Sequence, residues 1–69
     1  MEEKITAWVA RDKNPYRLGL FFDKPPVKGE STWLLNGSSR WIPFYYNLYP
    51  QIKWEDKEPT EVELTIKIK

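Results

Sequence analysis

The chain has 69 residues, enough for one small domain that buries about 60% of the surface its unfolded form exposes. It contains no cysteine and no histidine. This excludes disulfides, thiolate metal sites and the side chain that most often acts as a base near neutral pH. Its net charge of +1 argues against coating of long nucleic acid, because proteins with that role carry a large excess of positive charge.

The first two predicted elements are strands in which the side chains have a period of two. Residues 4–11 place apolar side chains on both sides, such as Val9 on one and Trp8 on the other, so we expect both faces to be covered. A polar turn containing Pro15 follows, and then a second strand over residues 16–22. Together these segments predict an antiparallel hairpin with a loop of four or five residues.

The middle of the chain is interrupted by prolines and by one strong turn signal. Pro25-Pro26 ends the second strand, because proline cannot donate to a ladder of hydrogen bonds. A short strand is expected over residues 31–35, followed by a turn at Asn36-Gly37, where both residues tolerate positive φ. A further strand is expected over residues 40–46, in which Pro43 indicates an edge position or a bulge.

The last third of the chain predicts one brief strand and one regular strand. Residues 47–50 break the pattern and have room for one helical turn, and residues 51–55 are expected to be extended. Residues 61–69 alternate strictly, which is typical of a half-buried antiparallel strand. The inward-facing side chains of this strand are Val62, Leu64, Ile66 and Ile68. We therefore expect residues 1–69 to form a single all-β domain, either a small antiparallel β-barrel or a curved meander of about five strands.

Catalysis is not expected from these residues. The serines of the chain have no histidine beside which they could act as nucleophiles. Glu55-Asp56 would point to opposite faces of a strand, and Glu61 and Glu63 fall on the solvent side of the last strand, so both carboxylate pairs are interpreted as solvated charges. The dispersed glycines form no phosphate-binding loop. We expect a protein that is not an enzyme, with no catalytic residue, cofactor or metal site.

Binding is better supported, because basic residues alternate with aromatic residues in two stretches. Aromatic faces stack on bases for about 1–3 kcal/mol each, and guanidinium groups bind phosphates with two parallel hydrogen bonds. Trp33 and Trp41 flank the Asn36-Gly37 turn and are expected to be neighbours across it. The alternative is that most of these aromatic residues form the core. The predicted ligand-binding residues are Arg11, Lys13, Tyr16, Arg17, Trp33, Arg40, Trp41 and Tyr45.

A third interpretation is a protein-binding surface. Residues 41–46 expose a large apolar area if the sheet is a single layer, and Trp, Tyr and Arg are enriched at interface hot spots. Pro43 would protect such an edge from unlimited addition of strands. Assembly into a homo-oligomer is also expected, because so small a chain without disulfides gains stability from it.

Several stretches of the sequence resemble a group of small uncharacterised phage and prophage proteins of Bacteroidales-type bacteria. The stretches are 7–12 (AWVARD), 18–25 (LGLFFDKP) and 49–56 (YPQIKWED), the last leading into 61–64 (EVEL). They span most of the chain in this order. They are structural motifs at strand ends and turns, and none of them is catalytic.

The resemblance implies a non-enzymatic phage protein that antagonises host antiviral defence. Such a protein would sequester a nucleotide second messenger or cap a host defence protein, as a homo-oligomer in the bacterial cytoplasm. The alternative is a small-barrel adaptor that binds nucleic acid or protein. No membrane partner is expected, because the apolar runs are far shorter than the roughly 20 residues that span a bilayer and the first residues are charged. Long nucleic acid is not an expected partner either.

Overall fold

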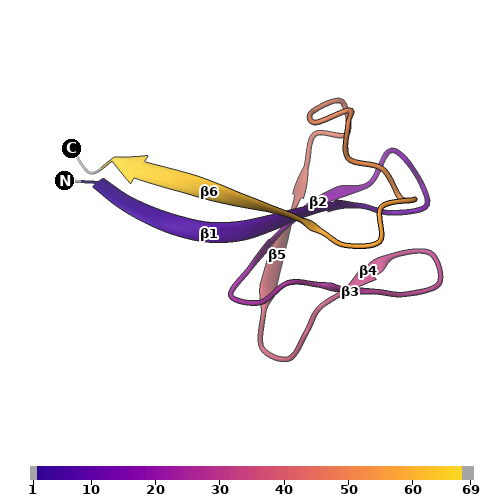
Figure 1. Ribbon diagram of the computed structural model, residues 1–69, viewed down its shortest axis with the longest axis horizontal. Helices are drawn as coiled ribbons and strands as arrows, with labels where there is room; N and C mark the ends of the chain where they lie inside the picture. Colours follow the sequence, from indigo (N-terminus) through magenta and orange to yellow (C-terminus); the bar gives the residue numbers. More distant parts are fainter. Residues whose placement is uncertain (1, 68–69) are drawn as a thin grey trace.

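The computed structural model describes residues 2–67 and contains six strands. These are β1 (Glu2–Arg11), β2 (Leu18–Phe22), β3 (Val27–Lys28), β4 (Trp33–Leu34), β5 (Arg40–Phe44) and β6 (Thr60–Lys67). Four of them form an antiparallel sheet in the order β5-β2-β1-β6, and β3 and β4 form a separate two-stranded hairpin (Figure 1). The expected all-β class is therefore confirmed.

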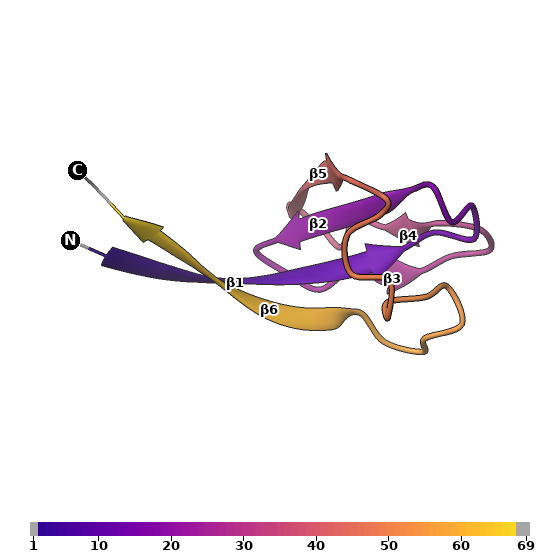
Figure 2. The same cartoon turned by 90° about the horizontal axis from the view of Figure 1, so that it is seen from above.

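β1 and β6 are longer than the strands beside them and continue as a two-stranded arm. Their pairing runs from Val9 opposite Thr60 to Glu2 opposite Lys67, whereas β2 pairs with β1 no further than Ala7. Figures 1 and 2 show this ribbon leaving the rest of the molecule. We call residues 2–6 and 63–67 the arm, and the remaining described residues the body.

One face of the sheet carries the larger core. Ala7 and Val9 of β1 pack with Leu18 and Leu20 of β2, and Ile52 reaches the same cluster from the long loop before β6. Each of these side chains is less than 5% exposed. The register explains the grouping, because Val9 lies opposite Leu20 and side chains directly opposite in an antiparallel pair share a face.

The other face carries a smaller aromatic core. Ala10, Phe21 and Trp33 are buried there, with Trp8 and Trp54 packed against them. Trp33 comes from β4, so the β3–β4 hairpin covers this face of the sheet. The prediction that β1 is covered on both faces is confirmed for the half that lies in the body.

The sheet is open, and a barrel is not confirmed. Its edges are β5 and β6, which do not pair with one another, so the described residues form no closed barrel. The strand order also differs from a simple meander, because β6 returns to pair with β1 while β5 pairs with β2. The edge position that Pro43 predicted for its strand is confirmed.

Two local predictions were wrong: the extended segment over residues 51–55, and the pairing of Trp33 with Trp41 across the turn at Asn36-Gly37. Residues 51–55 form turns and no strand: the amide of Ile52 donates to the carbonyl of Tyr49 (3.0 Å), and that of Asp56 to the carbonyl of Lys53 (3.1 Å). These two backbone amides therefore have acceptors within three residues and need no neighbouring strand. The turn at Asn36-Gly37 exists, with Gly37 at a φ of 67°, but it joins strands of different sheets.

The partners of the two tryptophans follow from this connection. Trp33 lies opposite Lys28 of β3, and Trp41 lies opposite Phe21 of β2, so the two are not cross-strand neighbours.

Candidate functional site

The most heavily bonded side chain in the body is that of Arg11, which is 8% exposed at the end of β1. A guanidinium group carries five N–H donors. Here each of them has a backbone carbonyl as its acceptor, at distances between 2.6 and 3.1 Å. The accepting carbonyls belong to Pro15, Tyr46, Leu48, Tyr49 and Ile52.

Arg11 therefore acts within the fold. Four of its five acceptors lie between residues 46 and 52, so this one side chain fixes a loop that has no ladder of its own. The sequence had placed Arg11 among the phosphate-binding residues. With every donor already bonded inside the chain, its guanidinium has no N–H left for a ligand in this structure.

A groove lies between the β3–β4 hairpin and the β2–β5 side of the sheet. Its volume is about 580 Å³. Small-molecule sites are typically about 300–1,000 Å³ and mostly apolar, so the groove is large enough for a ligand of nucleotide size. Its charged lining residues are Arg17 and Asp12, and its lining also includes Tyr16, Gly19, Phe21, Trp33 and Trp41.

The floor of the groove depends on Gly19. A Cβ atom placed on Gly19 would lie 2.9 Å from Cε1 of Phe21 and 3.6 Å from Cε3 of Trp41. The absence of a side chain lets Phe21 lie back over the strand, where its ring stacks with that of Trp41 at a centroid distance of 6.2 Å and an angle of 26°. Trp41 remains 49% exposed, so it presents aromatic surface to the groove.

Tyr16 and Arg17 are held at one end of the groove by the turn between β1 and β2. The amide of Asp12 donates to the carbonyl of Arg17 (2.9 Å), the amide of Arg17 donates to the carbonyl of Asn14 (3.0 Å), and the amide of Tyr16 donates to Asn14 Oδ1 (3.1 Å). Both side chains are nevertheless exposed, Tyr16 by 68%. The ring of Tyr16 meets that of Tyr46 edge-on at 5.1 Å, and Tyr46 is not part of the groove lining. Arg17 is therefore the exposed side chain of this turn that offers a charge to the groove.

Trp33 forms a fixed wall opposite. Its indole Nε1 donates to the carbonyl of Arg11 (3.0 Å), and its backbone amide donates to Asp12 Oδ1 (3.0 Å). It is 7% exposed, and its ring meets that of Trp54 edge-on at 6.3 Å. Trp33 is therefore mainly a core residue. This agrees with the alternative interpretation, in which most of the aromatic residues form the core.

The groove brings together four of the eight predicted ligand-binding residues, namely Tyr16, Arg17, Trp33 and Trp41. The other four lie elsewhere. Lys13 is exposed beside a smaller cavity of about 300 Å³ near Lys53, and Tyr45 is 77% exposed in the loop after β5.

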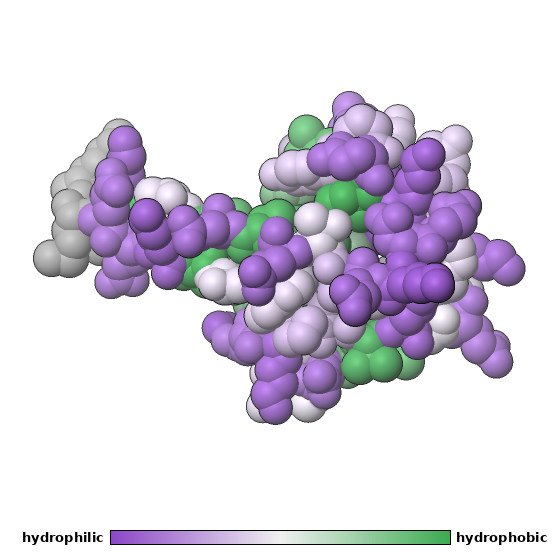
Figure 3. Space-filling view, in the orientation of Figure 1, coloured by the Kyte–Doolittle hydropathy of each residue, from purple (hydrophilic) through white to green (hydrophobic). Residues whose placement is uncertain are grey.

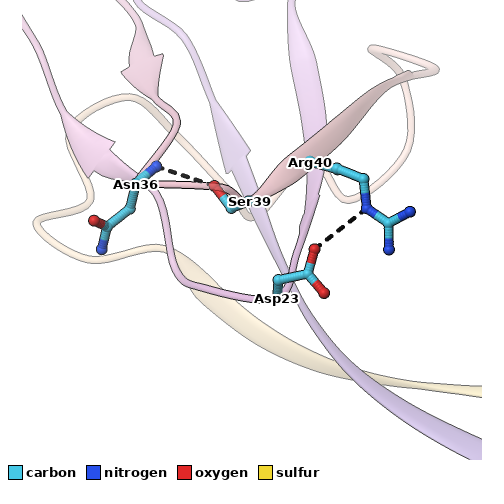
Figure 4. Close-up of polar contacts among 4 residues, drawn as sticks. All are labelled: Asp23, Asn36, Ser39 and Arg40. Carbon is cyan, nitrogen blue, oxygen red and sulfur yellow. Dashed lines mark hydrogen bonds and ion pairs between the residues drawn. The ribbon is translucent and has the colours of Figure 1, made fainter.

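Arg40 is also outside the groove lining. It lies on β5 next to Trp41, so its side chain points to the opposite face of the sheet. There its Nε lies 3.3 Å from Asp23 Oδ2, in an exposed ion pair (Figure 4). The neighbouring turn is closed by the amide of Asn36, which donates to Oγ of the buried Ser39 (3.0 Å). This contact gives Ser39 a structural role.

The predicted ligand-binding residues did not include three contributors, namely Gly19, Phe21 and Lys28. Gly19 and Phe21 of β2 follow Arg17 at intervals of two residues, and this spacing was a signal that all three share a face. Lys28 had no comparable signal. Its ammonium lies 4.3 Å from the ring centroid of Trp54 and donates to the carbonyl of Asp56 at 2.9 Å, although both residues are more than 25 positions away in the chain.

The groove offers aromatic rings that can stack on a ligand and a guanidinium that can pair with an anion. No cluster of three or more acidic side chains within residues 2–67 is placed to hold a metal ion. The same residues include no helix of the length and apolar character needed to cross a membrane. No family model, curated protein or solved structure matches the chain.

Proposed function

We propose that the protein is a non-enzymatic binding protein and that the groove holds a nucleotide. One observation supports this above all. Arg17 and Trp41, from two separate parts of the chain, converge on one open groove together with the fixed wall of Trp33. Aromatic faces and a guanidinium are the groups that recognise a base and a phosphate.

The groove favours a short ligand over a polymer. Its lining contains one arginine and one aspartate, and the chain as a whole has a net charge of only +1. Binding of a long strand depends on many phosphate contacts and the release of their counterions. A mononucleotide or dinucleotide needs one or two such contacts, so its binding depends mainly on stacking.

The biological role that we propose is sequestration of a nucleotide signal, as an antagonist of host antiviral defence. This part rests on the resemblance of the sequence to phage proteins. A sequestering protein acts stoichiometrically, which is consistent with a groove lined by binding groups.

Capping of a defence protein is the second candidate. The loop after β5 exposes large apolar side chains, with Tyr45 77%, Tyr46 53% and Leu48 40% exposed. Arg11 holds this loop in one conformation, so the patch is presented without a large cost in ordering. Tyrosines on such a surface are typical of protein interfaces.

The two candidates are separated by a pair of aromatic substitutions. In calorimetric titrations with mononucleotides and cyclic dinucleotides, Trp41→Ala should weaken binding about tenfold or more, since one stacked base contributes about 1–3 kcal/mol. Tyr45→Ala removes a more exposed ring outside the groove and should leave the affinity unchanged. Thermal melting of both variants controls for loss of fold.

Salt dependence tests the alternative of a nucleic-acid adaptor. A nucleotide held in the groove should lose little affinity as salt rises, whereas a single-stranded oligonucleotide should lose it steeply. Binding of oligonucleotides alone, or equal affinities of the wild type and Trp41→Ala for every nucleotide, would contradict the proposal.

A further inference from the structure

The two edges of the sheet are protected very differently. β5 has five residues and includes Pro43, which cannot donate a hydrogen bond to an added strand. β6 has eight residues, with neither proline nor glycine among them. Within residues 2–67 it pairs with β1 on one side and with no strand on the other. Long regular edges of this kind are where another strand adds.

The sequence of β6 is complementary to itself about Leu64. If a second copy of the strand runs antiparallel with Leu64 opposite Leu64, then Val62 lies opposite Ile66 of the second copy. In the same register Glu61 lies opposite Lys67, and Glu63 lies opposite Thr65. Every apolar side chain thus meets an apolar one, and the charged pair at each end has opposite signs.

The arm also has an unfilled apolar side. Val62 and Leu64 are half-buried and pack against the larger core. Beyond them Ile5 is half-buried and Ile66 is 46% exposed, because β2 does not extend along the arm. Figure 3 shows hydrophobic surface reaching the outside of the molecule along this ribbon. A two-stranded ribbon is marginal in water, and further strands stabilise it.

The charged side of the arm is equally open. Lys4 and Glu63 are paired at 3.8 Å and Glu2 and Lys67 at 3.9 Å, with every one of these side chains more than half exposed. Such exposed pairs are weak. Lys67, whose side chain is 75% exposed, is therefore available to Glu61 of a second copy.

We propose that two copies of the chain associate through β6. The two four-stranded sheets would then form one sheet of eight strands, in the order β5-β2-β1-β6-β6-β1-β2-β5. A two-fold axis through the Leu64 pair relates the copies, as in an isologous dimer. The groove is lined from β2, β4 and β5, on the far side of β1 from this edge, so both grooves stay open.

Charge reversal at the ends of the interface tests the register. Glu61→Lys places lysine opposite Lys67 twice in a symmetric dimer, and Lys67→Glu places glutamate opposite Glu61 twice. Because like charges directly opposite are destabilising, each variant alone should dimerise about tenfold more weakly than the wild type. A mixture of the two variants restores opposite charges at both ends, so it should form a heterodimer with near wild-type affinity.

Sedimentation over a range of concentrations measures each self-association, and native mass spectrometry with one variant isotopically labelled identifies the heterodimer. Recovery of dimerisation on mixing rules out a folding defect, because mixing cannot repair a chain whose own substitution prevents it from folding. Nucleotide binding should be the same in both variants, which separates this test from that of the groove. A wild type that stays monomeric, single variants that dimerise normally, or a mixture without preferential heterodimer would each overturn the proposal.

Discussion

Basic and isoleucine side chains that are buried in the body have exposed counterparts in the arm. In the body the charge of Arg11 is buried and bonded to five carbonyls, and Ile52 is 3% exposed. In the arm Lys4 and Lys67 form exposed ion pairs, and Ile66 is 46% exposed. The contrast indicates that the body provides most of the stability of the single chain, while the arm has surface left over for a partner.

The largest effect that separates the two regions is expected at Arg11. Arg11→Ala removes five charge-assisted hydrogen bonds, one of them buried and four partly buried, and should cost about 3–5 kcal/mol. A domain of this size has about that much stability in total. Thermal and urea unfolding should therefore show a chain that is largely unfolded at 25 °C.

Arg11→Lys is the matched control, since it keeps the charge but cannot reach five acceptors. It should fold with reduced stability, between Arg11→Ala and the wild type. If Arg11→Ala unfolds at the same denaturant concentration as the wild type, the loop from residue 46 to residue 52 is held by something other than this network.

A pair of isoleucine substitutions sharpens the comparison. Ile52→Ala removes a buried side chain of the larger core and should destabilise the chain by about 2–4 kcal/mol. Ile66→Ala makes the same chemical change on the half-exposed arm and should cost less than about 1 kcal/mol. Urea unfolding at low protein concentration measures both for the single chain. Equal losses would mean that the arm is part of the core.

The smallest effect is expected at the ion pairs of the arm. Lys4→Ala breaks the pair with Glu63, whose two side chains are 63% and 62% exposed, and should change stability by less than about 0.5 kcal/mol. The melting temperature of the wild type should accordingly respond little to added salt. A larger change would show that the charged side of the arm contributes to the fold of the single chain.

Local pattern predicted the parts of the molecule that depend on alternation. The strict period of two over residues 61–69 identified β6, although Ile68 and Lys69 lie outside the described residues. The apolar residues on both sides of the first strand indicated that both of its faces are covered, and Pro43 indicated an edge. In each case the evidence lay within a few residues of the position concerned.

Contacts between distant residues were not predictable in the same way. Arg11 resembled a phosphate-binding residue because nothing nearby in the sequence shows that its acceptors lie up to 41 positions away. The segment containing Ile52 and Trp54 resembled a strand because its apolar residues alternate with polar ones. Both side chains are packed in or against the cores, but turns place them there. The tryptophans beside the Asn36-Gly37 turn share a groove without sharing a hairpin.

The proposed nucleotide groove is tested most directly by comparing two exposed arginines, Arg17 just before β2 and Arg40 on β5. Native mass spectrometry of the purified protein mixed with mononucleotides and cyclic dinucleotides should show one nucleotide bound per chain. The complex should be clearly weaker in Arg17→Ala, which removes the guanidinium of the groove, and unchanged in Arg40→Ala, which removes one from the opposite face. Absence of any nucleotide complex, or the same complexes in all three proteins, would contradict the account.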